Sequence, residues 1–277
     1  MRIATWNINS IRTRKDRAVD FLIQHDVDVI ALQETKCRND QFPLEEFETA
    51  GYEVHHWGLN QWNGVAIASR LPMHDLEEGF PGMPGFDKNG GDPALEARAV
   101  AATIDGVRLW SVYVPNGRSL TDPHLTYKLQ FLHALGEAVR SWHAGNPDIP
   151  GLVGGDFNIA PRREDVGDPA FVEGLSTHVS PEERSALDRA LQSAQLVDLV
   201  RPSVPEGFTF WDYTQGKFPK NHGLRIDFLF GHPSLLSRVS HAEIVRSQRS
   251  GEQPSDHVPV VVDIEGEDSD DDRPMVF

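Results

Sequence analysis

The sequence predicts an α/β protein, a four-layer α/β sandwich in which two packed mixed β-sheets are flanked by helices. Two observations support this fold class. Apolar strands and amphipathic helices follow the order strand–helix–strand in both halves of the chain, and the two halves are loosely alike. Paired strands such as 97–104 and 107–114, joined through Asp105 and Gly106, favour antiparallel hairpins. Strict strand–helix alternation would instead have indicated a doubly wound sheet.

Short apolar runs bounded by turn-forming residues predict the strands. In chain order these strands are residues 2–7, 27–33, 52–57, 64–69, 97–104, 107–114, 151–156, 225–230, 240–246 and 258–264.

Apolar residues at helical spacing predict the helices. In residues 14–25, Val19, Leu22 and Ile23 lie on one face beside polar positions. Pro181 stands at a first helical position after Ser180, a residue type that caps helices. In chain order the predicted helices are residues 14–25, 43–50, 121–143, 181–194 and 233–237.

The chain is acidic, with a formal net charge of −16 over 277 residues. Residues 265–277 hold six acidic groups and one arginine, so −5 belongs to this segment and −11 to the rest. This balance argues against a protein that wraps nucleic acid by bulk charge, but it is compatible with an acidic metal pocket inside a small basic rim. No linker interrupts residues 1–264, which are predicted as a single domain, and 265–277 is predicted to be a disordered acidic tail.

The compartment is predicted from cysteine usage and hydropathy. The chain has one cysteine, Cys37, so it cannot form an intrachain disulfide, as is usual for a reducing compartment. The start of the chain is strand-like and lacks the apolar core of a signal peptide, and no apolar stretch approaches the length of a membrane span. We therefore expect a cytoplasmic protein with no membrane partner.

Polar residues end the apolar runs repeatedly. Asn7, Glu34, Asp156 and Asp227 each follow or end such a run, and Asp256 precedes the final one. This pattern indicates strand ends that converge on one acidic site, suited to holding a divalent metal and attacking a phosphate. Oxygen ligands alone would select Mg²⁺, or Mn²⁺, over zinc.

Each motif also has a simpler interpretation. Taken alone, the segment 154–158, with Asp156 and Asn158 two apart, is more typical of a turn after a strand. Glu34 could bind a metal, or it could pair at the surface with Lys36 or Arg38.

The same holds for the other polar and aromatic positions. The Asp256–His257 pair could serve proton transfer or cap a strand, and a histidine such as His257 would explain an acid at Asp227. The hydroxyl of Tyr113 could donate to a phosphoryl oxygen, or the ring could pack in a half-buried strand. The aromatic segment 208–211 could be core or a stacking platform for a sugar or base.

Taken together, these segments resemble the exonuclease III family of apurinic/apyrimidinic endonucleases, part of the endonuclease/exonuclease/phosphatase superfamily with its DNase I-like sandwich. The resemblance runs from Met1 to about Ile264. Its motifs, each weak alone but specific in this order, are Thr5–Arg12, Leu32–Lys36, Asn63–Ile67, Tyr113–Gly117, Gly155–Ile159, Thr209–Tyr213, Gly223–Asp227 and Ser255–His257.

The resemblance implies a role for each matched residue. For the metal it implies Glu34 as principal ligand with Asp256 and Asn9 nearby, although many family members carry an aspartate at the position of Asn9. For catalysis it implies Asp156 and Asn158 on the attacking water, Asn7 holding that network, and His257, oriented by Asp227, on the phosphate with Tyr113. For the substrate it implies Asn116 on the same phosphate, Lys36 supporting the metal carboxylates, Phe210, Trp211 and Leu224 around an abasic deoxyribose, and Arg12 and Trp62 on the DNA backbone and groove.

The implied function is a Mg²⁺-dependent DNA repair nuclease, with Mn²⁺ as an alternative metal. It would act as a monomer on double-stranded DNA with abasic sites or 3′ ends. It would hydrolyse the phosphodiester 5′ to abasic sites by in-line attack of water, and trim 3′ ends as a 3′–5′ exonuclease. Two alternatives stay open: a phosphatase or phosphodiesterase acting on lipid or small-molecule phosphates, and a DNA-binding module without catalysis.

Overall fold

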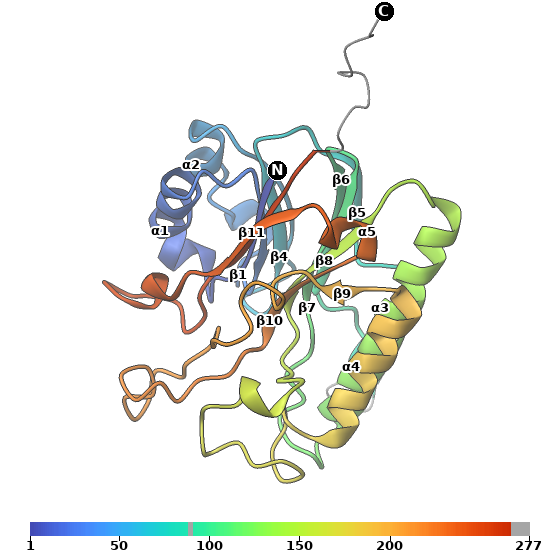
Figure 1. Ribbon diagram of the computed structural model, residues 1–277, viewed down its shortest axis with the longest axis vertical. Coiled ribbons are helices and arrows are strands. Elements are labelled where there is room, and N and C mark those ends of the chain that lie inside the picture. Colours follow the sequence, from blue (N-terminus) through green and yellow to red (C-terminus); the bar gives the residue numbers. More distant parts are fainter. Residues whose placement is uncertain (88–90, 267–277) are drawn as a thin grey trace, which may run out of the picture.

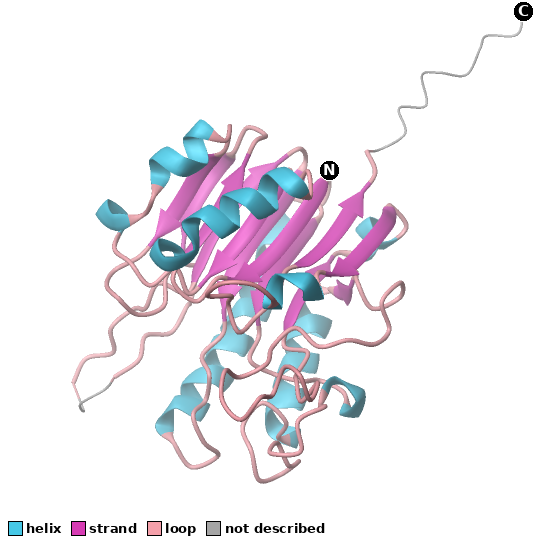
Figure 2. Ribbon diagram, turned by 90° about the vertical axis from the view of Figure 1, so that its left-hand side faces the viewer, coloured by secondary structure: helices cyan, strands magenta, loops and turns pink. Residues whose placement is uncertain are grey.

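Two six-stranded mixed β-sheets pack face to face, and helices lie on the outer faces of both (Figures 1 and 2). The computed structural model describes residues 1–87 and 91–266. The predicted four-layer α/β sandwich is confirmed. Most of the predicted acidic tail, residues 267–277, lies outside the described residues.

The first sheet has the strand order β11-β12-β1-β2-β4-β3 and the second β5-β6-β7-β8-β10-β9. The strands of the first sheet are β1 (Arg2–Asn7), β2 (Val29–Gln33), β3 (Glu53–Trp57), β4 (Val65–Ser69), β11 (Val239–Ile244) and β12 (Val260–Ile264). Those of the second are β5 (His74–Glu78), β6 (Ala99–Ile104), β7 (Val107–Tyr113), β8 (Gly151–Asp156), β9 (Val197–Asp198) and β10 (Asp227–Gly231). The helices are α1 (Ile11–Gln24), α2 (Leu44–Thr49), α3 (Pro123–Gly145), α4 (Pro181–Ala194) and α5 (Pro233–Leu236), with 3₁₀ turns at Asn39–Gln41, Arg163–Asp165 and Arg246–Arg249.

Each sheet is built around one parallel pair of strands. β1 pairs in parallel with β2 after the crossover helix α1, and β7 pairs in parallel with β8 after α3. Antiparallel strands flank both pairs: β12 and β4 in the first sheet, β10 and β6 in the second. The loose likeness of the two halves in sequence therefore corresponds to a repeated topology.

Three apolar layers hold the sheets and helices together. Between the sheets, side chains such as Val65, Ile67 and Leu109 are buried. Phe21 of α1 and Phe47 of α2 pack on the outer face of the first sheet, while α3 and α4 pack on that of the second. Burial of this apolar surface is the main stabilising contribution to the sandwich.

The local sequence explains where the elements turn and begin. β6 and β7 form the predicted hairpin, with Asp105 and Gly106 both at positive φ, as a two-residue turn requires. α4 begins with a capping box, in which Ser180 Oγ accepts from the backbone N–H of Glu183 at 3.2 Å. Asp122 caps α3 by accepting from the backbone N–H of His124 at 2.8 Å.

Several predicted boundaries were wrong. α1 begins at Ile11 rather than at residue 14, and its backbone is irregular at Arg14, whose guanidinium turns back to the carbonyls of Ile8 and Asn9. β5 was not predicted because it is an edge strand of mostly exposed, polar residues, and β9 because it has two residues. Among the described residues, no helix is both long and apolar enough to cross a membrane.

Candidate active site

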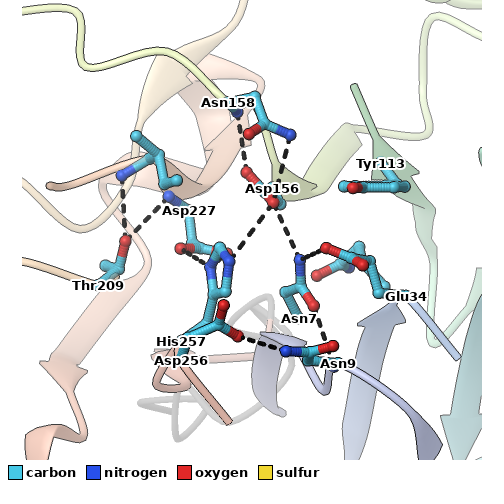
Figure 3. A network of polar contacts seen from close by, with 12 residues as sticks. Asn7, Asn9, Glu34, Tyr113, Asp156, Asn158, Thr209, Asp227, Asp256 and His257 are labelled. Carbon is cyan, nitrogen blue, oxygen red and sulfur yellow. Dashed lines mark hydrogen bonds and ion pairs between the residues drawn. The ribbon is translucent and has the colours of Figure 1, made fainter. Parts of the chain in front are cut away.

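The polar strand ends meet at one edge of the sandwich (Figure 3). The parallel pairs β1–β2 and β7–β8 lie opposite each other across the interface between the sheets, so their carboxyl ends converge. Asn7 and Glu34 come from the first pair, and Tyr113 and Asp156 from the second. Asp227 lies directly opposite Asp156 in the β8–β10 ladder.

Asn7 connects the two sheets. Its Nδ2 donates to Glu34 Oε1 at 2.9 Å and to Asp156 Oδ2 at 3.0 Å. Its Oδ1 accepts from the backbone N–H of Asn9 at 3.0 Å. The side chain is fully buried, so one amide sets the position of two carboxylates from different sheets.

His257 faces Asp156 and is held from behind by Asp227. Its Nδ1 lies 2.8 Å from Asp227 Oδ2, and its Nε2 lies 3.8 Å from Asp156 Oδ2. Burial lowers the pKa of His257, but the charges of Asp227 and Asp156 outweigh burial and raise it to about 10. At neutral pH the ring is therefore an imidazolium.

Asp156 has the properties of a general base. Its Oδ1 accepts from the backbone N–H of Asn158 at 2.8 Å, which orients the carboxylate. Burial raises its pKa to about 7, with the cation of His257 opposing this shift and the anion of Asp227 adding to it. A carboxylate with a pKa near neutrality can accept a proton from water at physiological pH.

The predicted metal ligands form a chain of contacts with Lys36. Lys36 Nζ lies 2.7 Å from Glu34 Oε2 and 2.5 Å from Asn9 Oδ1, and Asn9 Nδ2 donates to Asp256 Oδ1 at 2.9 Å. Burial raises the pKa of Glu34, but Lys36 and the amide of Asn7 outweigh it and lower the pKa below its usual value. The surface pairing of Glu34 with Lys36 is thus present, whereas Arg38 pairs with Asp40.

These residues fit a hard divalent cation. Glu34, Asp256 and Asn9 offer side-chain oxygens, the donors that Mg²⁺ prefers, and an ammonium already lies between two of them. Ligand atoms of Glu34, Asp156 and His257 also lie within 4.8 Å of one another. His257 is a poor ligand, however, because a protonated imidazole has no free lone pair.

Tyr113, Asn116 and Asn158 lie on the other side of Asp156. The ring of Tyr113 stacks 4.9 Å from the guanidinium of Arg98. Burial and the charge of Glu34 raise the pKa of Tyr113 well above 10, so the hydroxyl keeps its proton and can donate to an oxyanion. Asn116 Nδ2 donates to Asn158 Oδ1 at 3.2 Å.

Two of the three residues predicted to line a sugar pocket are buried. The Phe210 ring is partly exposed and lies 4.9 Å from that of His257. Trp211 is 1% exposed because its indole packs on Phe208 and Phe218, and Leu224 is fully buried beneath Phe210. In this conformation Trp211 and Leu224 offer no open apolar surface, and the assignment of the three residues to a sugar pocket stays a prediction.

Arg12 and Trp62, predicted to touch DNA, both have exposed side chains outside this polar cluster. Arg12 lies on α1, and Trp62, which is 59% exposed, lies on the loop between β3 and β4. Their contact with DNA stays a prediction.

Sequence reasoning missed residues that lie behind the site. Arg98 was hidden in an apolar strand pattern. Lys128 carried a signal, because it interrupts the apolar stripe that Leu125 and Leu132 form on α3. Glu183 carried another, at the third position of the capping box of α4.

Comparisons with known proteins agree with this geometry. Residues 4–257 match the Endonuclease/Exonuclease/phosphatase family. Exodeoxyribonuclease III of Haemophilus influenzae is 29% identical over 94% of this chain and 98% of its own. The Neisseria 3′ phosphatase NExo, solved with a product DNA hairpin, superposes with a TM-score of 0.86 at 34% identity, covering 96% of this chain and 99% of that one. An AP endonuclease from Archaeoglobus fulgidus gives 0.84 at 31%, with the same coverage. The family resemblance is confirmed: the chain belongs to the endonuclease/exonuclease/phosphatase family, as an enzyme of its exonuclease III branch.

Proposed function

We propose that this enzyme is a Mg²⁺-dependent DNA repair nuclease, which cuts the phosphodiester 5′ to abasic sites and trims 3′ ends of duplex DNA. The observation that carries the proposal is the pair of hydrogen bonds from Asn7 to Glu34 and Asp156, called here the Asn7 bridge. It holds Glu34, a carboxylate suited to bind a metal, beside Asp156, a carboxylate suited to accept a proton. The names of the relatives, an exodeoxyribonuclease, a 3′ phosphatase and an AP endonuclease, support DNA as the substrate.

Each residue of the site has a separate role in the hydrolysis. Asp156 accepts a proton from water while the water oxygen forms a bond to phosphorus and the bond from phosphorus to the 3′ oxygen breaks. Asn158 and Asn7 hold the orientation of Asp156. The imidazolium of His257 and the hydroxyl of Tyr113 donate to the phosphoryl oxygens as negative charge develops. Glu34, Asp256 and Asn9 would hold Mg²⁺, which would supply Lewis-acid polarisation of the phosphate and stabilisation of the leaving oxygen.

Abasic DNA suits such a site on physical grounds. A nucleotide without a base has no pairing or stacking to break when it turns out of the helix. We further propose that residues 1–264 act as one domain and as a monomer. Location in the cytoplasm stays a prediction.

The test is a comparison of substrates with purified protein. Duplexes carrying an abasic site, a blunt 3′ end or a 3′ phosphate are incubated with Mg²⁺, and with EDTA as control. We expect Mg²⁺-dependent cutting of the abasic duplex. Hydrolysis of a phosphoinositide without attack on any duplex would contradict the proposal, as would binding of DNA with no cleavage.

A 3′-end-processing enzyme is a second candidate. It is favoured by the burial of Trp211 and Leu224, which leaves Phe210 as the one partly exposed member of the predicted sugar pocket. The 3′ phosphatase at 34% identity also favours it. Rapid removal of a 3′ phosphate with no incision at an internal abasic site would favour this candidate.

A further inference from the structure

A buried ion pair lies behind the site, between the two long helices of the second sheet. Lys128 of α3 and Glu183 of α4 are both 0% exposed, and Lys128 Nζ lies 2.5 Å from Glu183 Oε1. Removing two charges from water is costly, and an apolar pair at such a place is often no less stable. The proposed mechanism does not use either charge, so their retention calls for another explanation.

The remaining donors of the ammonium go to two particular carbonyls. Lys128 Nζ donates to the backbone oxygen of Asn158 at 2.6 Å and to that of Asn116 at 3.2 Å. With Glu183 these contacts use all three N–H groups of the side chain. One ammonium therefore joins the loop after β7 to the loop after β8, at the two asparagines whose side chains contact each other.

Glu183 also holds a third segment, residues 177–178, beside the two loops. Its Oε1 also accepts from Thr177 Oγ1 at 2.8 Å and from the backbone N–H of His178 at 3.0 Å. The ring of His178 in turn donates through Nδ1 to the backbone oxygen of Asn158 at 2.5 Å. The oxygen of Asn158 thus receives two donors from this network.

The backbone conformation at both loops depends on this packing. Asn158 has a φ of +52°, in the left-handed region that a non-glycine residue adopts at a cost. Gly117 has a φ of +90°, and a Cβ there would lie 2.7 Å from Thr177 Oγ1 and 3.3 Å from Lys128 Cδ. The loops after β7 and β8 therefore pack directly against the ion pair of Lys128 and Glu183.

From these contacts we infer that Lys128, charged and held by Glu183, is a positioning residue for Asn116 and Asn158. This assignment rests on the proposed function. It explains how the side chains of Asn116 and Asn158 keep their positions around the attacking water and the phosphate. Lys128 acts through the two asparagines and touches neither substrate nor metal.

The test replaces both charges together, so that neither is left buried alone. The variant Lys128→Met/Glu183→Gln is compared with Lys217→Met/Asp168→Asn, which removes another buried lysine–carboxylate pair with a 2.5 Å contact. Among the described residues, this control pair is hydrogen-bonded to neither Asn116 nor Asn158. Small displacements of catalytic groups are costly, so we expect kcat to fall about 10-fold or more in the first variant, with KM changed less than about 3-fold. The control should keep kcat within about 2-fold, and the melting temperature of each variant is measured alongside.

A second comparison separates positioning from general stability. The Lys128/Glu183 replacement is repeated in a protein that already carries Asn116→Ala and Asn158→Ala. Residues that act as one unit are non-additive, so we expect less than about a 2-fold further loss of kcat there. An equal loss in both backgrounds, or full kcat in the folded variant, would overturn the assignment.

Folding and substrate identity are controlled separately. If the double replacement does not fold, Glu183→Gln alone is used, because it keeps the shape of the pair. The loss of kcat that it causes must likewise disappear in the protein that carries Asn116→Ala and Asn158→Ala. Wild-type turnover on each duplex tests the proposed function. The ratio of variant to wild type, on whichever phosphodiester the wild type cleaves, tests Lys128.

Discussion

At the scale of single residues, Asp156 and His257 show how the surroundings set chemical roles. Both side chains are buried, and they lie 3.8 Å apart. Because Asp227 neutralises His257 from the far side, the imidazolium does not fully suppress the basicity of Asp156. One carboxylate thus serves as a partner for the cation while the other stays free to take a proton.

Replacing Asp156 with asparagine tests the general base. The amide keeps the shape and the contact with Asn158 but cannot accept a proton, so we expect kcat to fall by about 10²–10⁴-fold. DNA affinity, measured by fluorescence anisotropy in Ca²⁺, should stay within about 3-fold of wild type. Unchanged turnover would remove Asp156 from its role on the attacking water.

The pH profile gives an independent view of the same group. Asp156 acts as its anion, so kcat/KM should fall about 10-fold per pH unit below its pKa of about 7 and level off above it. His257, with a pKa of about 10, stays charged through this range. A profile that is flat from pH 5 to 8, at saturating Mg²⁺ and with the chemical step rate-limiting, would contradict this assignment.

At the scale of elements, strand ends could be predicted because polar residues directly after apolar runs are a local signal. Glu34 and Asp156 were found in this way. The Asn7 bridge could not be found, since it depends on how two sheets stack, and residues 149 positions apart in the chain form it. The burial of Trp211 could not be predicted, because an aromatic cluster looks the same in sequence whether it lines a pocket or fills the core.

The capping box of α4 offers a test at this scale. Ser180 Oγ accepts from the backbone of Glu183 and donates to its carboxylate at 2.6 Å. Ser180→Ala should lower the free energy of unfolding by about 1–2 kcal/mol, measured by urea denaturation. Ser185→Ala, at an exposed position of the same helix, is the control and should change it by less than about 0.5 kcal/mol. Equal effects of the two changes would argue against the cap.

At the scale of the whole molecule, the site belongs to neither sheet alone. The first sheet and its loops supply Asn7, Glu34 and His257, and the second supplies Asp156 and Asp227. The apolar layer between the sheets therefore determines the catalytic geometry as well as stability.

A cavity in that layer should affect both properties. Leu109 is 1% exposed in the layer between the sheets, so Leu109→Ala should cost about 2–5 kcal/mol of unfolding free energy. We expect activity and near-ultraviolet circular dichroism to be lost at one shared, lower melting temperature. Retention of activity after the tertiary signal has gone would show that the site does not need both sheets in register.

The pairing of β1 with β12 has a consequence for synthesis. Thr5 lies opposite Val260, so the sheet that opens with residues 2–7 is completed by residues 260–264. Asp256 and His257 arrive with that same segment. A chain synthesised only as far as residue 255 has all the strands of its second sheet, but it lacks both His257 and the strand that closes the first sheet. The imidazolium and the closed first sheet are therefore gained together, when residues 256–264 join residues 2–7.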